Sequence, residues 1–210
     1  MIVKQILAIV FSTCSVLASC QTGSINQPTS TTQATLNKKY QVDKIKVPTG
    51  FKVDVFAEVP NARSMCLGTK GTLFVGNRSE DNVYAVVDEN KDGIADKVYT
   101  IATDLNMPNG VAFKDGSLYI ATVDKIYRLD NIEDQLANPP TPILVTDQYP
   151  NKTHHGWKFI AFGPDGKLYV PVGAPCNVCN EKDSIYATIT SINANGTGRE
   201  IYAKGVRNSV

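Results

Sequence analysis

A β-hairpin unit that occurs three times is the feature that most constrains the fold of this 210-residue chain. In each copy a short strand pattern leads into a glycine turn, and a second apolar strand follows the turn. The copies cover residues 67–76, 112–121 and 161–171, and their turn glycines are Gly71, Gly116 and Gly166. These glycines are 45 and then 50 residues apart.

A further strand pattern follows each copy, at residues 82–87, 125–129 and 187–192. A repeat of this length with several strands per copy is typical of β-propeller blades. A β-sandwich with coincidental hairpins is the alternative, and the regular repeat favours the propeller. The sequence therefore predicts an all-β fold, a β-propeller. About three blades fit between Phe51 and Gly205, fewer than the four or more that close a ring, so the chain is expected to be the N-terminal half of a longer propeller.

The first 20 residues have the pattern of a lipoprotein signal peptide. Lys4 precedes an apolar run at residues 6–11 that is too short to span a bilayer. The run Leu17-Ala18-Ser19-Cys20 resembles the bacterial lipobox, in which the cysteine is lipidated and becomes the mature N-terminus. An ordinary signal peptide that contains a cysteine is the alternative. Gln21, in place of an aspartate, favours the outer membrane, so we expect a lipid-anchored protein facing the periplasm.

Residues 21–41 are rich in Ser, Thr, Gln and Asn and predict a disordered polar tether, which leaves residues 42–210 as the propeller domain. The chain has 21 basic and 20 acidic residues, a net charge of +1. Nothing in this balance favours nucleic acid, and membrane attachment is expected only through the lipid at Cys20.

Two cysteines form the motif Cys176-Asn177-Val178-Cys179. A zinc site would need a second such pair, and a c-type haem motif would need a histidine after Cys179. In an oxidising compartment the pair predicts a disulfide that stiffens a loop, with free thiols as the alternative. Cys66 lies in a strand pattern and is expected to be a buried, small apolar residue.

An acidic loop follows the strand at 82–87. Its oxygen-bearing side chains alternate before Gly93, as in the first part of an EF-hand loop, but Tyr99 stands where the closing glutamate would be. An Asx-turn loop without metal is the alternative. The candidate calcium ligands are Asp88, Asn90, Asp92 and Asp96.

The chain has two histidines, His154 and His155, and one tryptophan, Trp157. Histidine is the side chain whose ordinary pKa lies nearest neutrality, so the pair is a candidate site for proton abstraction. A structural turn with one histidine packed on Trp157 is the alternative.

Several motifs resemble the soluble pyrroloquinoline quinone (PQQ)-dependent sugar dehydrogenases, and more closely their L-sorbosone dehydrogenase-like branch. They are His155-Gly156-Trp157-Lys158 followed by residues 162–169, then Gly205-Val206-Arg207-Asn208, and the stretches 106–113 and 172–179. The resemblance covers roughly residues 47–210. It implies a six-bladed propeller that binds PQQ and calcium and oxidises a sugar or a sugar-derived aldehyde.

The resemblance also implies roles for single residues. His155 would be the catalytic base that takes the hydroxyl proton while hydride passes to the quinone, and Arg207 and Asn208 would contact the cofactor. Ala174 stands where the glucose-oxidising branch has an aspartate that supports the histidine. The family's calcium ligands for PQQ and its later cationic contacts would lie beyond Val210, so the chain as given is expected to be inactive alone.

Two other functions compete with this reading. One is a non-catalytic binding module at the cell surface, and the other is a calcium-dependent sugar lactonase, which also uses six blades. A lactonase should place carboxylate and Asn ligands at the central axis, whereas the strand starts here offer His155 and Arg207. The quinone reading is therefore favoured; the sequence names neither the sugar nor the electron acceptor.

Overall fold

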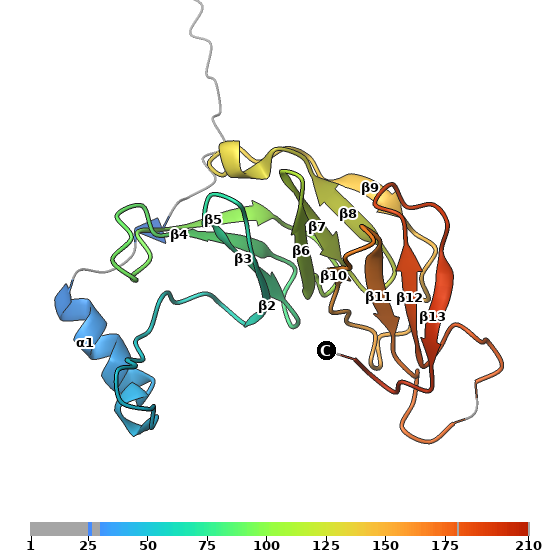
Figure 1. Cartoon of the computed structure of the whole chain (residues 1–210), viewed down its shortest axis with the longest axis horizontal. Coiled ribbons are helices and arrows are strands. Elements are labelled where there is room, and N and C mark those ends of the chain that lie inside the picture. Colours follow the sequence, from blue (N-terminus) through green and yellow to red (C-terminus); the bar gives the residue numbers. More distant parts are fainter. Residues whose placement is uncertain (1–24, 27–29, 180, 210) are drawn as a thin grey trace, which may run out of the picture.

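Three antiparallel sheets lie side by side in the computed structural model, which describes residues 25–26, 30–179 and 181–209 (Figure 1). The predicted signal peptide of residues 1–20, the lipid site Cys20 and the first residues of the tether lie outside the described residues. No helix within the described part of the chain has the length and apolar character that crossing a membrane requires.

Each sheet is built on a meander of four strands that are consecutive in the chain, and in the first sheet a fifth, two-residue strand, Ile25–Asn26, pairs with the last strand of the meander. The first has the order β1-β5-β4-β3-β2, with β1 at Ile25–Asn26, β2 at Ala62–Leu67, β3 at Leu73–Asn77, β4 at Val83–Val87 and β5 at Lys97–Ala102. The second runs from β6 to β9, at Gly110–Lys114, Ser117–Ala121, Ile126–Leu129 and Ile143–Thr146. The third runs from β10 to β13, at Ala161–Phe162, Leu168–Val172, Thr188–Ile192 and Glu200–Lys204.

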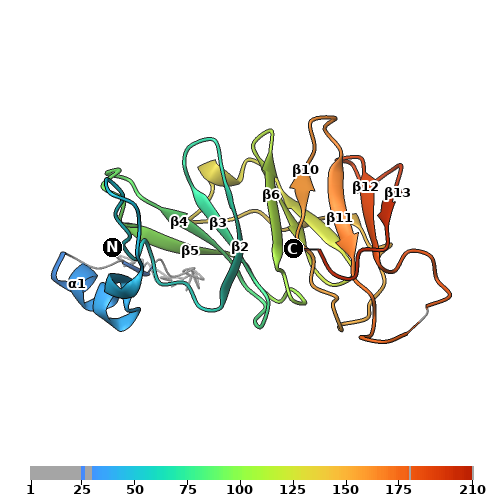
Figure 2. The same ribbon diagram turned by 60° about the horizontal axis from the view of Figure 1, so that its bottom comes forward.

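The sheets stack as propeller blades. The inner strands β2, β6 and β10 are neighbours in space, and the outer strands fan away from them (Figure 2). The predicted all-β propeller with about three blades is therefore confirmed. The repeated glycines join β2 to β3, β6 to β7 and β10 to β11. Their φ angles are 91° at Gly71, 81° at Gly116 and 76° at Gly166, a backbone region that favours glycine over residues with a Cβ.

Apolar side chains fill the spaces between neighbouring blades. Phe74 and Leu118 are fully buried between the first and second blades, where the Phe74 and Phe113 rings stack at 5.6 Å. Ile160 and Leu168 are buried in the corresponding cluster between the second and third blades. Burial of a side chain of this size contributes about 1.5–3 kcal/mol, so the stacking of blades is the main source of stability.

An α-helix, α1, occupies Ser30–Lys39, where the sequence analysis expects a disordered tether. The helix is fixed by polar contacts with the extended segment before β2. Gln33 Nε2 donates to Val55 O at 2.6 Å, and Asn37 Nδ2 donates to Asp54 Oδ1 at 2.8 Å. The polar composition that suggested disorder thus supplies the hydrogen bonds that order residues 30–39. Two short 3₁₀ helices, Val42–Lys44 and Ile132–Asp134, complete the fold.

Candidate functional site

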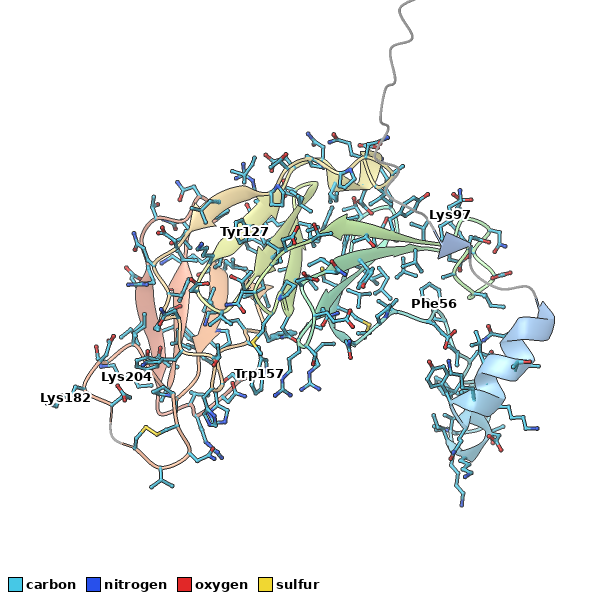
Figure 3. All side chains as sticks on the ribbon, turned by 180° about the vertical axis from the view of Figure 1, so that it is seen from behind. Phe56, Lys97, Tyr127, Trp157, Lys182 and Lys204 are labelled. Carbon is cyan, nitrogen blue, oxygen red and sulfur yellow. A yellow bond between two sulfur atoms is a disulfide. The ribbon has the colours of Figure 1, made fainter. Side chains whose placement is uncertain are left out.

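Loops from all three blades meet at one edge of the sheet stack. Because the strands alternate in direction, the ends of β3, β11 and β13 and the starts of β6 and β10 lie at the same edge. A backbone hydrogen bond from Asn77 N to Pro108 O, at 3.0 Å, joins the first and second blades, and one from Ala174 N to Arg207 O, at 2.8 Å, joins two loops of the third blade. Trp157 and the disulfide lie at this edge in Figure 3.

His155 is held at this edge by the loop after β11. Its Nδ1 lies 2.8 Å from the carbonyl oxygen of Ala174. A carbonyl can only accept, so Nδ1 is the donor, and the neutral ring carries its lone pair on Nε2. The contact that orients the ring thus comes from a backbone carbonyl, that of Ala174. The backbone of His155 is left-handed, with φ of 51°, which marks a locally constrained turn.

Gly173 makes this arrangement possible through its missing side chain. A Cβ added to Gly173 would lie 2.3 Å from His155 O and 3.2 Å from Asn208 Oδ1. The loops that carry His155 and Asn208 can therefore approach β11 this closely only because residue 173 is glycine.

A pocket of about 400 Å³ opens beside the histidine pair and is lined by Arg78, Met107, Thr153, His154, His155 and Trp157. The guanidinium of Arg78 lies 3.8 Å from the centre of the Trp157 ring, a cation–π contact. The indole Nε1 of Trp157 is buried and has no hydrogen-bond partner within the described chain. The pocket thus combines a cation, a planar aromatic surface and imidazoles.

His154 and Arg207 meet at a third side chain, Asn177. Both His154 Nε2, at 3.3 Å, and Arg207 Nη2 contact Asn177 Oδ1. The His154 and His155 rings lie 4.2 Å apart, centre to centre. The structure therefore brings His155, Arg207 and Asn208, the residues predicted from the resemblance, to one edge, while their catalytic and cofactor-binding roles stay predictions.

The segment between His155 and β10 is also held in place by hydrogen bonds of Lys158. Lys158 is 1% exposed and its Nζ donates to Gly156 O at 3.3 Å, while Asn109 Nδ2 donates to Lys158 O at 2.7 Å. Burial lowers the pKa of Lys158 from 10.5 to about 8, partly offset by the carboxylate of Asp124. The bond from Asn109, which directly precedes β6, ties the segment that follows His155 to the second blade.

Arg78, Asn177 and Lys158 also belong to this region, although the sequence patterns assign no role to any of them. Arg78 follows directly after β3, and residues just beyond a strand at the shared edge are the signal that could have found it. Asn177 lies inside the Cys-Asn-Val-Cys motif, in which only the two cysteines carry a recognisable signal.

Cys176 and Cys179 are paired as the motif predicts, whereas Cys66, expected to be buried, is half-buried. Cys176 and Cys179 form a disulfide at the edge that carries His155. Cys66, on β2, is a free thiol, and burial raises its pKa from 9.0 to about 12.

The acidic loop between β4 and β5 is closed by its own hydrogen bonds. Asp88 Oδ2 accepts from Gly93 N at 2.9 Å, Asp92 Oδ1 accepts from Ile94 N at 2.8 Å, and Asp96 Oδ2 accepts from Glu89 N at 2.6 Å. Asn90 Oδ1 accepts from Asp92 N at 2.9 Å. Across residues 25–26, 30–179 and 181–209, no group of three or more His, Cys, Asp or Glu side chains is arranged to hold a metal ion. Asx-turns account for this loop as it stands, and calcium binding there stays a prediction.

Solved structures similar to this chain include sugar dehydrogenases that use PQQ. The holo PQQ domain of pyranose dehydrogenase from Coprinopsis cinerea has a TM-score of 0.62 at 15% identity, over 71% of this chain and 40% of that chain. The PQQ-bound aldose sugar dehydrogenase from Streptomyces coelicolor has a TM-score of 0.53 at 18% identity, over 72% and 52%. A nidogen/laminin complex is similar at a TM-score of 0.50 and 16% identity, over 70% and 51%. At these identities the likeness shows the β-propeller fold alone.

A curated relative is an uncharacterized protein of Borreliella burgdorferi, 32% identical over 178 residues. The match covers 79% of this chain and 45% of that protein. The chain thus spans about half, or less, of the relatives it matches. Residues 37–208 match one sequence family across most of the chain, and the protein belongs to that family, described as Domain of unknown function (DUF7133).

Proposed function

We propose that the complete protein is a PQQ-dependent dehydrogenase that oxidises a sugar or a sugar-derived aldehyde, with His155 as the general base. The observation that carries the proposal is the hydrogen bond between His155 Nδ1 and Ala174 O, at 2.8 Å beside the pocket. It selects the tautomer whose Nε2 is free to accept a proton.

The side chains around the pocket suit a planar, multiply carboxylated cofactor. Arg78 and Arg207 can pair with carboxylates, and Trp157 offers a flat aromatic surface. The unpartnered indole N–H of Trp157 is a further donor for a bound acceptor group. Arg78, Arg207 and Asn208 are therefore the residues of this chain that would hold PQQ. PQQ, when bound, supplies the acceptor for hydride.

His155 then has a defined task. Nε2 takes the proton from the substrate hydroxyl, and the Nδ1–H to Ala174 O bond keeps the ring oriented while it gains positive charge. The ring of His154 lies beside it, with the two ring centres 4.2 Å apart. Trp157 lies edge-on beside His155, with the two ring centres 6.1 Å apart.

The proposal concerns the complete protein, since the described chain supplies three blades and spans 40% and 52% of the two PQQ enzymes above. A cofactor held from the top of a whole ring would have only part of its contacts here. We therefore expect the 210-residue chain alone to lack dehydrogenase activity, and we assign calcium and the remaining cofactor contacts to further blades.

The test compares His155→Ala with His154→Ala in the complete protein, supplied with PQQ, calcium, a panel of aldoses and a dye acceptor. Loss of the base should lower turnover by about 100-fold or more, whereas the neighbouring substitution should have a much smaller effect. Binding of PQQ, measured by calorimetry, should survive in both variants. Turnover near wild type in His155→Ala would refute the assignment of the base. Bound PQQ without dye reduction on any sugar would instead favour a non-catalytic binding module.

A further inference from the structure

We infer that the Cys176–Cys179 disulfide is a redox-sensitive switch for the histidine pocket: when oxidised it fixes Asn177 between His154 and Arg207, and reduction releases both. The inference deepens the proposed function, because it concerns regulation of the same site. Its test needs neither PQQ nor sugar, so it can fail or succeed independently of the dehydrogenase activity.

The geometry centres on one amide oxygen. Asn177 lies inside the ring that the disulfide closes, and its Oδ1 is contacted by His154 Nε2 at 3.3 Å and by Arg207 Nη2. His154 belongs to the loop before β10, and Arg207 to the segment after β13. Asn177, on the loop after β11, thus links the loop before β10 to the segment after β13.

The disulfide is what restricts Asn177. The Cα atoms of Cys176 and Cys179 are 6.0 Å apart, so residues 177 and 178 form a short closed loop. Val178 is 95% exposed, which shows that this loop gains no order from apolar packing. Asn177 and Cys179 are exposed as well. Without the cross-link the loop would regain the conformational freedom that a short closed ring lacks.

The same exposure makes the disulfide accessible to a reductant. A thiolate of a dithiol attacks one sulfur, the S–S bond breaks, and a mixed disulfide forms. The second thiol of the reductant then displaces the remaining cysteine. The protein gains two electrons and two protons as two thiols, and the dithiol becomes a cyclic disulfide. Exposed disulfides of this kind are commonly the regulatory ones.

The effect of reduction would reach the pocket through the adjacent histidines. The ring centres of His154 and His155 lie 4.2 Å apart, and that of His155 lies 6.1 Å from Trp157. Once Asn177 is free, His154 and Arg207 lose a shared acceptor, and the loop of residues 153–158 loses one of its outer contacts. The pocket would then open toward solvent on the side of the disulfide.

The chain carries its own reporter for this change, because Trp157 is its only tryptophan. The experiment treats the oxidised full chain with dithiothreitol and measures tryptophan emission, together with hydrogen exchange of residues 153–158. Mass spectrometry of the tryptic peptide 168–182, which holds both cysteines, gives the reduced fraction. Reduction should move the emission maximum to longer wavelength and speed exchange of these amides by roughly tenfold, the scale of one lost hydrogen bond to a charged group.

Three variants separate the switch from general destabilisation. Asn177→Ala keeps the disulfide but should show the reduced-like emission without reductant, and should change little on reduction. Asn177→Asp keeps the acceptor oxygen and should behave as wild type. The double variant Cys176→Ser/Cys179→Ser should resemble the reduced protein, and its emission and exchange should not change when dithiothreitol is added.

Two outcomes would overturn the inference. The first is complete reduction of the peptide with unchanged emission and exchange. The second is exchange that accelerates equally throughout β10–β13, since that would mean the disulfide stabilises the third blade as a whole.

Discussion

Replacing Lys158 with methionine should make the protein more stable at neutral pH. It should also remove the increase in the free energy of unfolding that Lys158 causes in the wild-type protein between pH 8 and 10.5. Lys158 is 1% exposed and has one hydrogen bond, from Nζ to Gly156 O, with the ring of Tyr149 at 5.4 Å. Burial lowers its pKa from 10.5 to about 8, against the opposing effect of Asp124. The ammonium group of Lys158 is thus poorly hydrated in the folded protein, whereas water hydrates it fully in the unfolded chain.

The sign follows from proton binding in the two states. Below pH 8 the lysine is protonated in both states, so the folded protein carries the full cost of the buried charge. Between pH 8 and 10.5 the unfolded chain binds more protons, and the free energy of unfolding rises with pH. Above pH 10.5 both states are neutral and the cost is gone. A pKa lowered from 10.5 to about 8 corresponds to about 3 kcal/mol.

Methionine removes this cost and also removes the hydrogen bond to Gly156 O, which contributes about 1 kcal/mol. Lys158→Met should therefore be more stable than wild type by about 2 kcal/mol at pH 7 and less stable by about 1 kcal/mol above pH 10.5. Urea unfolding, followed by Trp157 fluorescence and circular dichroism at several pH values, measures this difference.

The difference between the two proteins isolates Lys158, because Cys66 and Tyr149, whose pKa values burial raises, are present in both. Lys38→Met, at an exposed lysine on α1, is the control and should show no such pH-dependent difference. A Lys158→Met difference that stays constant from pH 7 to 10.5 would refute the reasoning.

Two further predictions follow from contacts in the structure. Gly173→Ala places a Cβ 2.3 Å from His155 O and 2.7 Å from His155 Cβ, so it should lower the free energy of unfolding by about 1–3 kcal/mol and shift Trp157 emission. Urea titration measures this change, and an unchanged free energy of unfolding in Gly173→Ala would contradict the prediction. The pKa of Cys66, raised to about 12, should slow its alkylation by iodoacetamide at pH 8 by at least roughly 100-fold relative to the urea-unfolded chain. Mass spectrometry of the peptide 64–70 follows the modification, and rapid labelling of folded protein would contradict the buried environment.

The parts of the fold that could be predicted are those with a local signal. Each repeated hairpin combines apolar strands with a glycine of positive φ, and both leave a pattern in a few consecutive residues. The outer strand β13 has no such pattern, because most of its side chains are exposed. Helix α1 was missed for a related reason: its order comes from Asp54 and Val55, which lie well beyond it in the chain.

The candidate site divides in the same way. His155, Arg207 and Asn208 were found through motif spacing within a single family pattern. Arg78 stacks on Trp157, 79 positions later, and Asn177 meets Arg207, 30 positions later. Contacts between residues this far apart in the chain leave no periodic trace in the sequence, so only the folded arrangement reveals them.

The meander order of the sheets has a consequence for how the protein is made. Apart from the short strand β1, which pairs with β5, every blade consists of strands that follow one another in the chain, so each four-stranded meander can form from nearby residues with low contact order. The first blade can fold during synthesis before the last strands leave the ribosome. The histidine pocket cannot take its final form so early, because His155 is held by Ala174 after β11, and Ala174 is in turn bonded to Arg207 after β13. Nascent chains should therefore gain native-like sheets well before the histidine pocket is complete, and errors late in synthesis should leave folded sheets with an incomplete pocket.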